Sequence, residues 1–96
     1  MDEIALIRAA QRGDLSAMEA LYRRYNSKMY HTALIVLGDP HRAEDAVQEA
    51  FVRAFRSIRT FDVSRPFAPW LTRIVINRCR SFQQQERRWV PCGDGP

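Results

Sequence analysis

Residues 67–88 decide the fold, and they read FAPWLTRIVINRCRSFQQQERR from Phe67 to Arg88. Apolar side chains recur here at spacings of three and four, the pattern of an amphipathic helix that packs one side against a core. The stripe consists of Leu71, Ile74, Val75, Arg78, Cys79 and Phe82, and only Arg78 interrupts its apolar character. The stretch therefore predicts a helix with a core-facing side.

The opposite side of the same predicted helix is polar and contains no carboxylate. Its stripe consists of Arg73, Asn77, Arg80, Gln84 and Arg87. Cations suit phosphate oxygens, and an amide side chain can pair with a base edge through one donor and one acceptor. Trp70 lies at the start of the helix, where a large flat ring could stack on a base. A solvated basic surface gives the same pattern, so the residues alone leave both interpretations open.

The rest of the chain is helical in its pattern as well. The 96 residues are enough for one domain, Gly is rare, and the apolar periodicity is helical almost throughout. We therefore expect an all-α protein, a compact bundle of about four helices. Residues 1–50 carry six Lys or Arg against eight Asp or Glu, whereas residues 51–96 carry nine against three. This basic second half favours a polyanion as its partner.

Turn residues divide the chain before residue 67 into three predicted helices, which span residues 2–11, 15–37 and 40–60. Gly13 suits the end of the first helix and Asp14 the N-cap of the second. Ser16 and Glu19 offer an alternative capping box two residues further on.

The second break, at residues 38–40, is the clearest in the chain. Gly38 suits a helix end, Asp39 an N-cap, and Pro40 the first helical position, where a missing N–H costs nothing. In the helix before this break, Tyr22, Tyr25 and Tyr30 follow the apolar period. We therefore expect these tyrosines to pack at the core or its rim, although an aromatic platform for bases is the alternative.

The third predicted helix has one unbroken apolar stripe, formed by Ala43, Ala46, Val47, Ala50, Phe51, Ala54, Phe55 and Ile58. Its outer side starts acidic, with Glu44, Asp45 and Glu49, and ends basic, with Arg53, Arg56 and Arg59. The helix dipole accounts for that order of charges. It does not account for Gln48 and Val52, which lie beside the charges and suit a contact with another protein.

Residues 61–69 are predicted to form a loop that two prolines stiffen. Asp62, Ser64 and Arg65 place polar groups on it, next to the basic side of the last helix. Braced loops of this kind often carry specificity. Either Ser64 or Ala68 could precede the helix, because Ser64 is the better cap but would place Pro69 inside the first turns.

Several classes of protein find no support in the sequence. The two cysteines, Cys79 and Cys92, fit no metal spacing; Cys79 falls on the apolar stripe and Cys92 in a linker-like tail. No catalytic set of side chains, phosphate-cradling glycines or membrane-spanning run is present, so we expect no enzyme, no cofactor, no metal and no membrane insertion. A reducing, cytoplasmic setting is the default for such a chain.

Residues 43–88 resemble conserved region 2 of bacterial sigma factors of the extracytoplasmic-function (ECF) class. The motifs that carry the resemblance are AEDAVQEAF at residues 43–51 and FAPWLTRIVINR at residues 67–78, preceded by RGD at 12–14 and LYRRY at 21–25. The likeness covers about residues 2–89. It implies a helical domain over residues 1–89 and the start of a flexible interdomain linker over residues 90–96, in a fragment of a longer protein.

The resemblance implies a transcription initiation subunit without catalysis of its own. Asp45, Gln48 and Glu49, with Val52 beside them, would dock on the clamp helices of core RNA polymerase. The loop Asp62–Phe67, with Ser64 and Arg65, would receive a flipped base of the single-stranded non-template strand of the minus-ten promoter element. The DNA-binding set on the last helix would be Trp70, Arg73, Asn77, Arg80, Gln84 and Arg87. An anti-sigma factor would be a further partner.

Two departures and two alternatives accompany this interpretation. The loop is unusually rich in proline, and the second DNA-binding domain of the family, which reads the minus-thirty-five element, has no counterpart before Pro96. The main alternative is a helical protein-interaction module with an incidental basic side, and a duplex-binding helix-turn-helix is a weaker one. Reversing the charges of Asp45 and Glu49 is expected to leave thermal stability nearly unchanged, because exposed charges contribute little.

Overall fold

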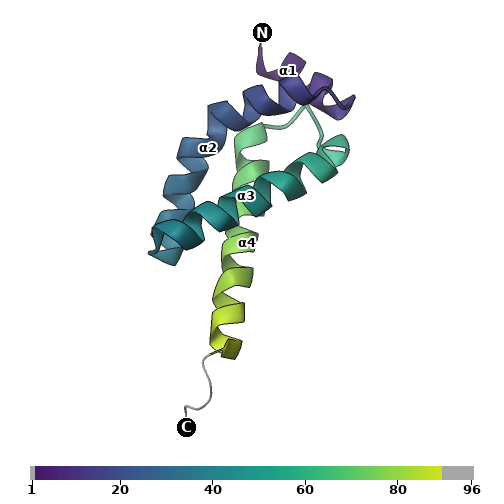
Figure 1. The fold of residues 1–96 in the computed structure, drawn as a ribbon. Coiled ribbons are helices and arrows are strands. Elements are labelled where there is room, and N and C mark those ends of the chain that lie inside the picture. The colour runs from purple at the N-terminus through teal and green to yellow at the C-terminus, as the bar shows by residue number, and fades with distance from the viewer. Residues whose placement is uncertain (1, 90–96) are drawn as a thin grey trace.

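The computed structural model describes residues 2–89, with side chains described as far as Gln85. Its elements are α1 (Glu3–Gln11), α2 (Leu15–Leu37), α3 (Pro40–Ser57), a short 3-10 turn η1 (Ile58–Thr60), and α4 (Phe67–Trp89). Figure 1 shows α2 and α3 meeting in a V, with α3 crossing α4 and the end of α4 extending beyond the other helices. The prediction of an all-α fold with four main helices is confirmed over the described residues.

Local capping determines the helix boundaries that the turn residues predict. The Asp14 carboxylate accepts hydrogen bonds from the backbone N–H groups of Ser16 and Ala17 at 2.9 and 3.3 Å, so Asp14, not Ser16, caps α2. Gly38 ends α2 in the left-handed conformation, with φ 72°, which costs least for Gly. Asp39 then caps α3 by accepting from the N–H of His41 at 2.8 Å.

The core lies where α2, α3 and α4 meet. On α3, Ala43, Ala46, Ala50 and Ala54 are all fully buried. Because alanine side chains are small, they let the neighbouring helices approach α3 closely, and larger side chains fill the remaining space. Those side chains include Leu21 and Met29 of α2 and Leu71, Val75 and Cys79 of α4, as the apolar stripes predict.

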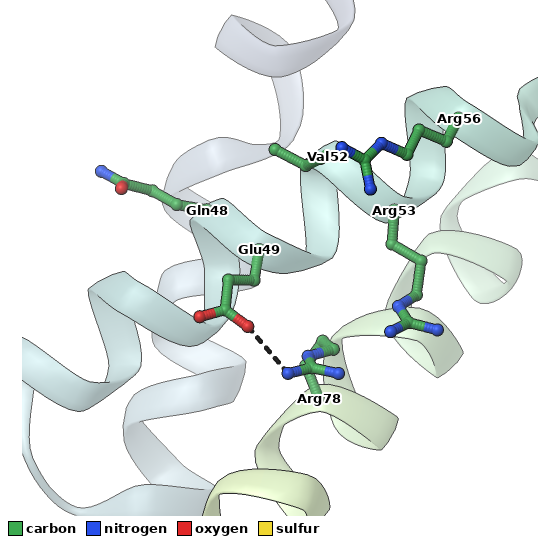
Figure 2. A pocket seen from close by; sticks show the side chains of 6 residues that line it. All are labelled: Gln48, Glu49, Val52, Arg53, Arg56 and Arg78. Atoms are coloured by element: carbon green, nitrogen blue, oxygen red, sulfur yellow. Dashed lines mark hydrogen bonds and ion pairs between the residues drawn. The ribbon is translucent and has the colours of Figure 1, made fainter.

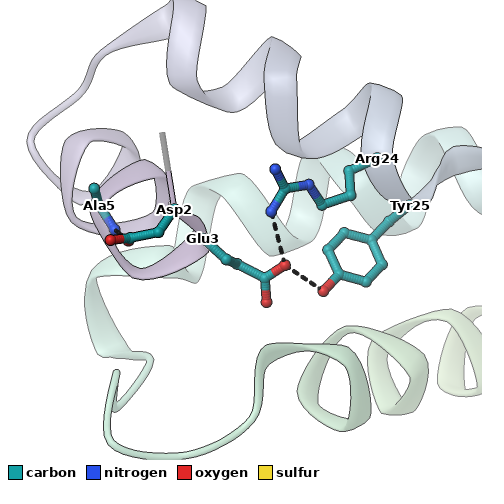
Figure 3. Close-up of polar contacts among 5 residues, drawn as sticks. All are labelled: Asp2, Glu3, Ala5, Arg24 and Tyr25. Atoms are coloured by element: carbon teal, nitrogen blue, oxygen red, sulfur yellow. Dashed lines mark hydrogen bonds and ion pairs between the residues drawn. The ribbon is translucent and has the colours of Figure 1, made fainter.

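Helix α1 is held against α2 by a polar cluster around Glu3, which Figure 3 shows. One oxygen of the Glu3 carboxylate accepts from the Tyr25 hydroxyl at 2.7 Å and from Arg24 at 3.2 Å. Burial is the main cause that raises the pKa of Tyr25 to about 12, and the hydrogen bond to Glu3 is the second. The ring of Tyr25 packs 5.5 Å from that of Phe67, so the cluster also supports the start of α4. Tyr22, Tyr25 and Tyr30 all pack against the core, which confirms that prediction.

The start of α4 corrects the predicted loop. The helix begins at Phe67, so Ala68 and Pro69 are helical and neither Ser64 nor Ala68 is the residue before it. Pro69 is tolerated because the first N–H groups of a helix have no partner within it, so the missing N–H removes no hydrogen bond. The loop between η1 and α4 is correspondingly shorter than the sequence predicts.

Cys79 is fully buried, as predicted, and burial raises the pKa of its thiol above the usual range. Cys92 and the predicted linker at residues 90–96 lie outside the described residues. Within residues 2–89, none of the helices combines the length and apolar character that a membrane span requires.

Candidate nucleic-acid and protein interfaces

The loop before α4 is ordered by a tight polar turn. Asp62 accepts hydrogen bonds from the Ser64 hydroxyl at 2.7 Å and from the Ser64 backbone N–H at 2.9 Å. These two hydrogen bonds hold the pKa of the Asp62 carboxyl below its ordinary value, and the bond from the hydroxyl has the larger effect. The N–H of Arg65 donates to the carbonyl of Asp62 at 3.0 Å, which closes the turn. All three side chains are exposed, so they remain accessible to a ligand.

Gln11 of α1 fixes the position where this loop begins. Its side-chain NH₂ donates to the carbonyl oxygens of Ile58 and Phe61, each at 2.9 Å. The Arg59 guanidinium donates in return to the Gln11 carbonyl at 3.2 Å. No sequence signal pointed to Gln11, because its partners lie 47 and 50 residues away in the chain.

The aromatic residues at the start of α4 form a cluster with Phe61. The ring of Phe61 lies 5.3 Å from that of Phe67 and 5.0 Å from that of Trp70. Phe67 is only 3% exposed, so the prediction that its side chain contacts DNA does not fit its position. Its large apolar ring, at the first residue of α4, packs into the core. Trp70 is half-buried and packs against the core, but keeps part of its surface accessible.

A groove of about 690 Å³ lies along α4 on the side of α2. Its lining consists of Lys28, Ala68, Pro69, Thr72, Arg73, Ile76, Asn77 and Arg80. Three of the predicted residues, Arg73, Asn77 and Arg80, therefore share one concave surface and are exposed on it. Gln84 is also exposed but lies beyond the groove lining, and the side chain of Arg87 lies outside the described residues.

The groove contains residues that the sequence pattern did not single out. Lys28 of α2 adds a third cation opposite α4, and Ile76 adds an apolar wall. Thr72 also lines it, and its hydroxyl donates to the Met29 sulfur at 3.8 Å. The position of Lys28 off the apolar stripe of α2 was visible in the sequence. Which neighbouring helix it would face was not, because periodicity alone does not set the rotation of one helix against another.

A second surface lies on α3, where Asp45, Gln48, Glu49 and Val52 are all exposed, as predicted. Gln48, Glu49 and Val52 line one side of a cleft of about 530 Å³ between α3 and α4. Arg53, Arg56 and Arg78 complete its lining. In Figure 2 the guanidinium groups of Arg53 and Arg78 point into the space between the two helices.

Glu49 is not an independent exposed charge, which corrects one expectation. Its carboxylate accepts from the Arg78 guanidinium at 2.7 Å, and the Arg78 side chain is only 18% exposed. Because Arg78 is mostly buried, reversing the charge of Glu49 would leave that cation without its partner, at a cost in stability. The Asp45 carboxylate forms no ion pair within the described part of the chain. The expectation of an unchanged thermal melt therefore holds only for charge reversal at Asp45.

The two surfaces occur on a fold that is shared with known proteins. The family described as Sigma-70 region 2 matches residues 21–89. This match covers more than half of the chain, so the protein belongs to the sigma-70 region 2 family.

The curated relatives place the chain with the ECF sigma factors. It is 41% identical over 71 residues to the ECF RNA polymerase sigma factor SigW of Bacillus subtilis (strain 168), covering 74% of this chain and 38% of the relative. It is 32% identical over 91 residues to the ECF RNA polymerase sigma-E factor of Escherichia coli (strain K12), covering 93% of this chain and 46% of the relative. The chain thus spans less than half the length of these relatives.

A solved structure shares the whole arrangement of helices. It is described as the NMR structure of the complex formed by an engineered region 2 of sigmaE in complex with GTAAAA. The two chains are 30% identical, the TM-score is 0.89, and the match covers 94% of each chain. The resemblance noted in residues 43–88 is therefore confirmed at the level of family and fold.

Proposed function

We propose that this chain is the part of an ECF sigma factor that docks on core RNA polymerase and recognises and melts the minus-ten promoter element. The observation that carries this proposal is the groove along α4, which joins three cations to an exposed amide in a chain of this family. A structural relative with the same fold binds GTAAAA. The cations of the groove and the groups that could meet bases have separate tasks.

The cations account for affinity. Lys28, Arg73 and Arg80 line the groove, and no side-chain ion pair is formed by any of them within the described residues. Neutralising phosphates releases condensed counterions, so this contribution falls with salt and is nearly independent of base sequence. It would hold a strand against α4 without selecting its sequence.

Base discrimination requires groups that meet unpaired bases. The side-chain amide of Asn77 has no hydrogen bond within the described residues, so its donor and acceptor are free to pair with a base edge. The exposed edge of Trp70 and the Asp62–Ser64 turn lie at the start of the same helix, where a base leaving the stack could be received. Such contacts exist only with an opened strand, so they would offset the free energy of melting.

This role assigns no catalytic step to the chain. Its partners would be core RNA polymerase, through α3, and the single-stranded non-template promoter strand, through α4 and the loop. An anti-sigma factor is a further proposed partner, and the cytoplasm is the compartment in which a partner of bacterial RNA polymerase acts. The alternative, a helical protein-interaction module whose basic side is incidental, predicts no preference for single strands.

Binding of a labelled GTAAAA strand, compared with a hairpin duplex that contains the same six bases, tests the proposal. Wild-type chain should bind the single strand more tightly, with an affinity that falls as salt is raised between roughly 50 and 200 mM. Arg73→Ala/Arg80→Ala should weaken binding to all sequences and flatten the salt dependence, whereas Asn77→Ala should reduce discrimination between bases. Arg12→Ala/Arg23→Ala, which removes the same number of charges from exposed positions outside the groove, is the matched control.

Equal binding of duplex and single strand would contradict the proposal. An equal loss of binding in the charge-matched Arg12→Ala/Arg23→Ala control would show that net charge, not the groove, is responsible. Trp70→Ala is a less direct variant, because a stacking loss of ~1–3 kcal/mol per base would be combined with the loss of its packing against Phe61.

A further inference from the structure

The cleft between α3 and α4 faces away from the groove just described. Arg78, which lines the cleft, is five residues after Arg73 and two before Arg80, which line the groove. At 3.6 residues per turn these separations correspond to about 140° and 160° around the helix axis. A strand lying in the groove would therefore not reach the cleft.

The cleft has an excess of positive charge that nothing in the described chain balances. Glu49 and Arg78 neutralise each other through their ion pair at 2.7 Å. Arg53 and Arg56 are exposed, and their guanidinium groups make no hydrogen bond or ion pair with any of the described residues. In Figure 2 the guanidinium of Arg56 extends beside Val52 and that of Arg53 toward Arg78. The cleft therefore presents two available cations around an apolar side chain.

Three of the residues that line this cleft continue a regular stripe along α3 that begins at Asp45. We call it the α3 outer stripe: Asp45, Glu49, Val52 and Arg56. The spacings of four, three and four keep these residues on one side of the helix over about 16 Å. Along the stripe the charge changes from acidic to basic, with Val52, which is 50% exposed, between the two halves. A stripe with this spacing suits a partner helix that lies along α3.

We propose that the docking surface for core RNA polymerase extends into the cleft, where Arg53 and Arg56 receive carboxylates of a polymerase helix whose apolar side chain covers Val52. The order of charges also sets the direction of that helix, with its acidic residues over Arg53 and Arg56 and its basic residues over Asp45. This inference rests on the proposed docking function of α3. It adds the arginines and the partner's charge order to a surface that the sequence assigned only to Asp45, Gln48, Glu49 and Val52.

A protein carboxylate fits the cleft better than a nucleic-acid phosphate does. A phosphate chain in the cleft would pass the Glu49 carboxylate and would leave Val52 against a charged backbone. A helix can place a carboxylate and an apolar side chain three or four residues apart, which matches the separation of Val52 from Arg56. The charge order of α3 also complements its dipole, but the dipole does not explain why an exposed valine lies between the charges.

The test measures association of the 96-residue chain with bacterial core RNA polymerase that lacks any sigma factor. Arg53→Glu/Arg56→Glu should lower the affinity by at least about tenfold, with a changed salt dependence, because opposed carboxylates would then meet. Arg12→Glu/Arg23→Glu changes the net charge by the same amount on exposed positions outside the cleft, and should change the affinity by less than about twofold. Circular dichroism should show the helical content of both variants unchanged.

A second pair of variants separates this inference from the function on which it rests. Asp45→Lys/Gln48→Lys should also weaken association, and neither position takes part in the Glu49–Arg78 pair. Normal binding by Arg53→Glu/Arg56→Glu together with lost binding by Asp45→Lys/Gln48→Lys would overturn the inference and leave the docking function intact. Normal binding by both would overturn the docking function and the inference with it.

Cross-linking from Val52, replaced by p-benzoylphenylalanine, tests the chemistry of the partner. The cross-linked polymerase peptide should come from a helix that carries Asp or Glu within one turn of the attachment point. A cross-linked segment without a carboxylate would contradict the inference. A different outcome would make the cleft a nucleic-acid site. In that outcome Arg53→Glu/Arg56→Glu binds polymerase normally but binds GTAAAA more weakly than the charge-matched control does.

Discussion

Asp62 and Ser64 show how two side chains organise the loop before α4. The Ser64 hydroxyl and N–H both donate to the same carboxylate oxygen of Asp62, at 2.7 and 2.9 Å. An ionised carboxylate accepts these bonds better than a protonated one, so the turn is most favourable when Asp62 is charged. The ionised turn then presents a hydroxyl and an anion of fixed position directly after Phe61, whose ring packs 5.0 Å from that of Trp70.

The pKa of Asp62 tests this view of the turn. Because its pKa in the folded chain lies below the ordinary value of 3.8, the stabilisation of the turn is present above that pH. It is lost as the pH falls through the lower, folded-state pKa. Carbon-detected NMR titration should show the Asp62 pKa moving up toward 3.8 in Ser64→Ala, which removes the largest cause of the shift. Ser57→Ala, outside the turn, is the control, and an Asp62 pKa that does not respond to Ser64→Ala would contradict the account.

At the scale of elements, α1 acts as a brace for the loop. All of α1 lies before the residues that the family match covers, which begin at residue 21. Yet Gln11 donates hydrogen bonds to the carbonyl oxygens of Ile58 and Phe61. Glu3 accepts a hydrogen bond from Tyr25, whose ring packs against that of Phe67. The position of the loop therefore depends on a helix that is distant from it in the sequence.

Gln11→Ala should separate the bracing role of α1 from a general role in stability. It removes two donors and leaves two part-buried carbonyl oxygens without their partner, at a cost of ~1–3 kcal/mol in unfolding free energy. Single-strand binding should fall more than the loss of folded protein explains, because the loop becomes less ordered. Urea unfolding and oligonucleotide titration at a temperature far below the melt measure the two effects.

Gln85→Ala provides the comparison for that experiment, since Gln85 is exposed and makes no hydrogen bond with the described residues. Gln11→Ala could lower the free energy of unfolding and still bind single strands, per folded molecule, as tightly as Gln85→Ala does. That result would mean that α1 stabilises the fold but does not position the loop.

How far the sequence predicts these elements depends on whether the signal is local. The boundary at residues 38–40 is set by local chemistry. Gly38 adopts the left-handed conformation that ends α2, and Asp39 caps α3, and both features were predictable from the sequence. The start of α4 was not, because it depends on the packing of Phe67 against Phe61 and Tyr25 rather than on a cap. The same packing explains why Phe67, predicted to contact DNA, is in the core.

At the scale of the whole molecule, α4 separates two exposed surfaces. Its groove joins Arg73, Asn77 and Arg80 to Lys28 of α2, and its other side joins Arg78 to Glu49 of α3. Helical periodicity predicted that the first three residues share a side. It could not predict the contributions of Lys28 and of the Glu49–Arg78 pair, because these depend on how the helices cross, which Figure 1 shows. The geometry lets both surfaces be occupied at once.

The most direct test of the central claim, that the groove along α4 receives single-stranded DNA, is amide NMR mapping. The spectrum of the ¹⁵N-labelled chain would be recorded while an unlabelled GTAAAA strand is added. The largest chemical-shift changes should fall at Lys28, in the turn around Ser64, and along α4 at Thr72, Asn77 and Arg80. The amides of the α3 outer stripe should change little. Changes that concentrate on residues 45–56 instead, or that are absent from the groove, would contradict the account.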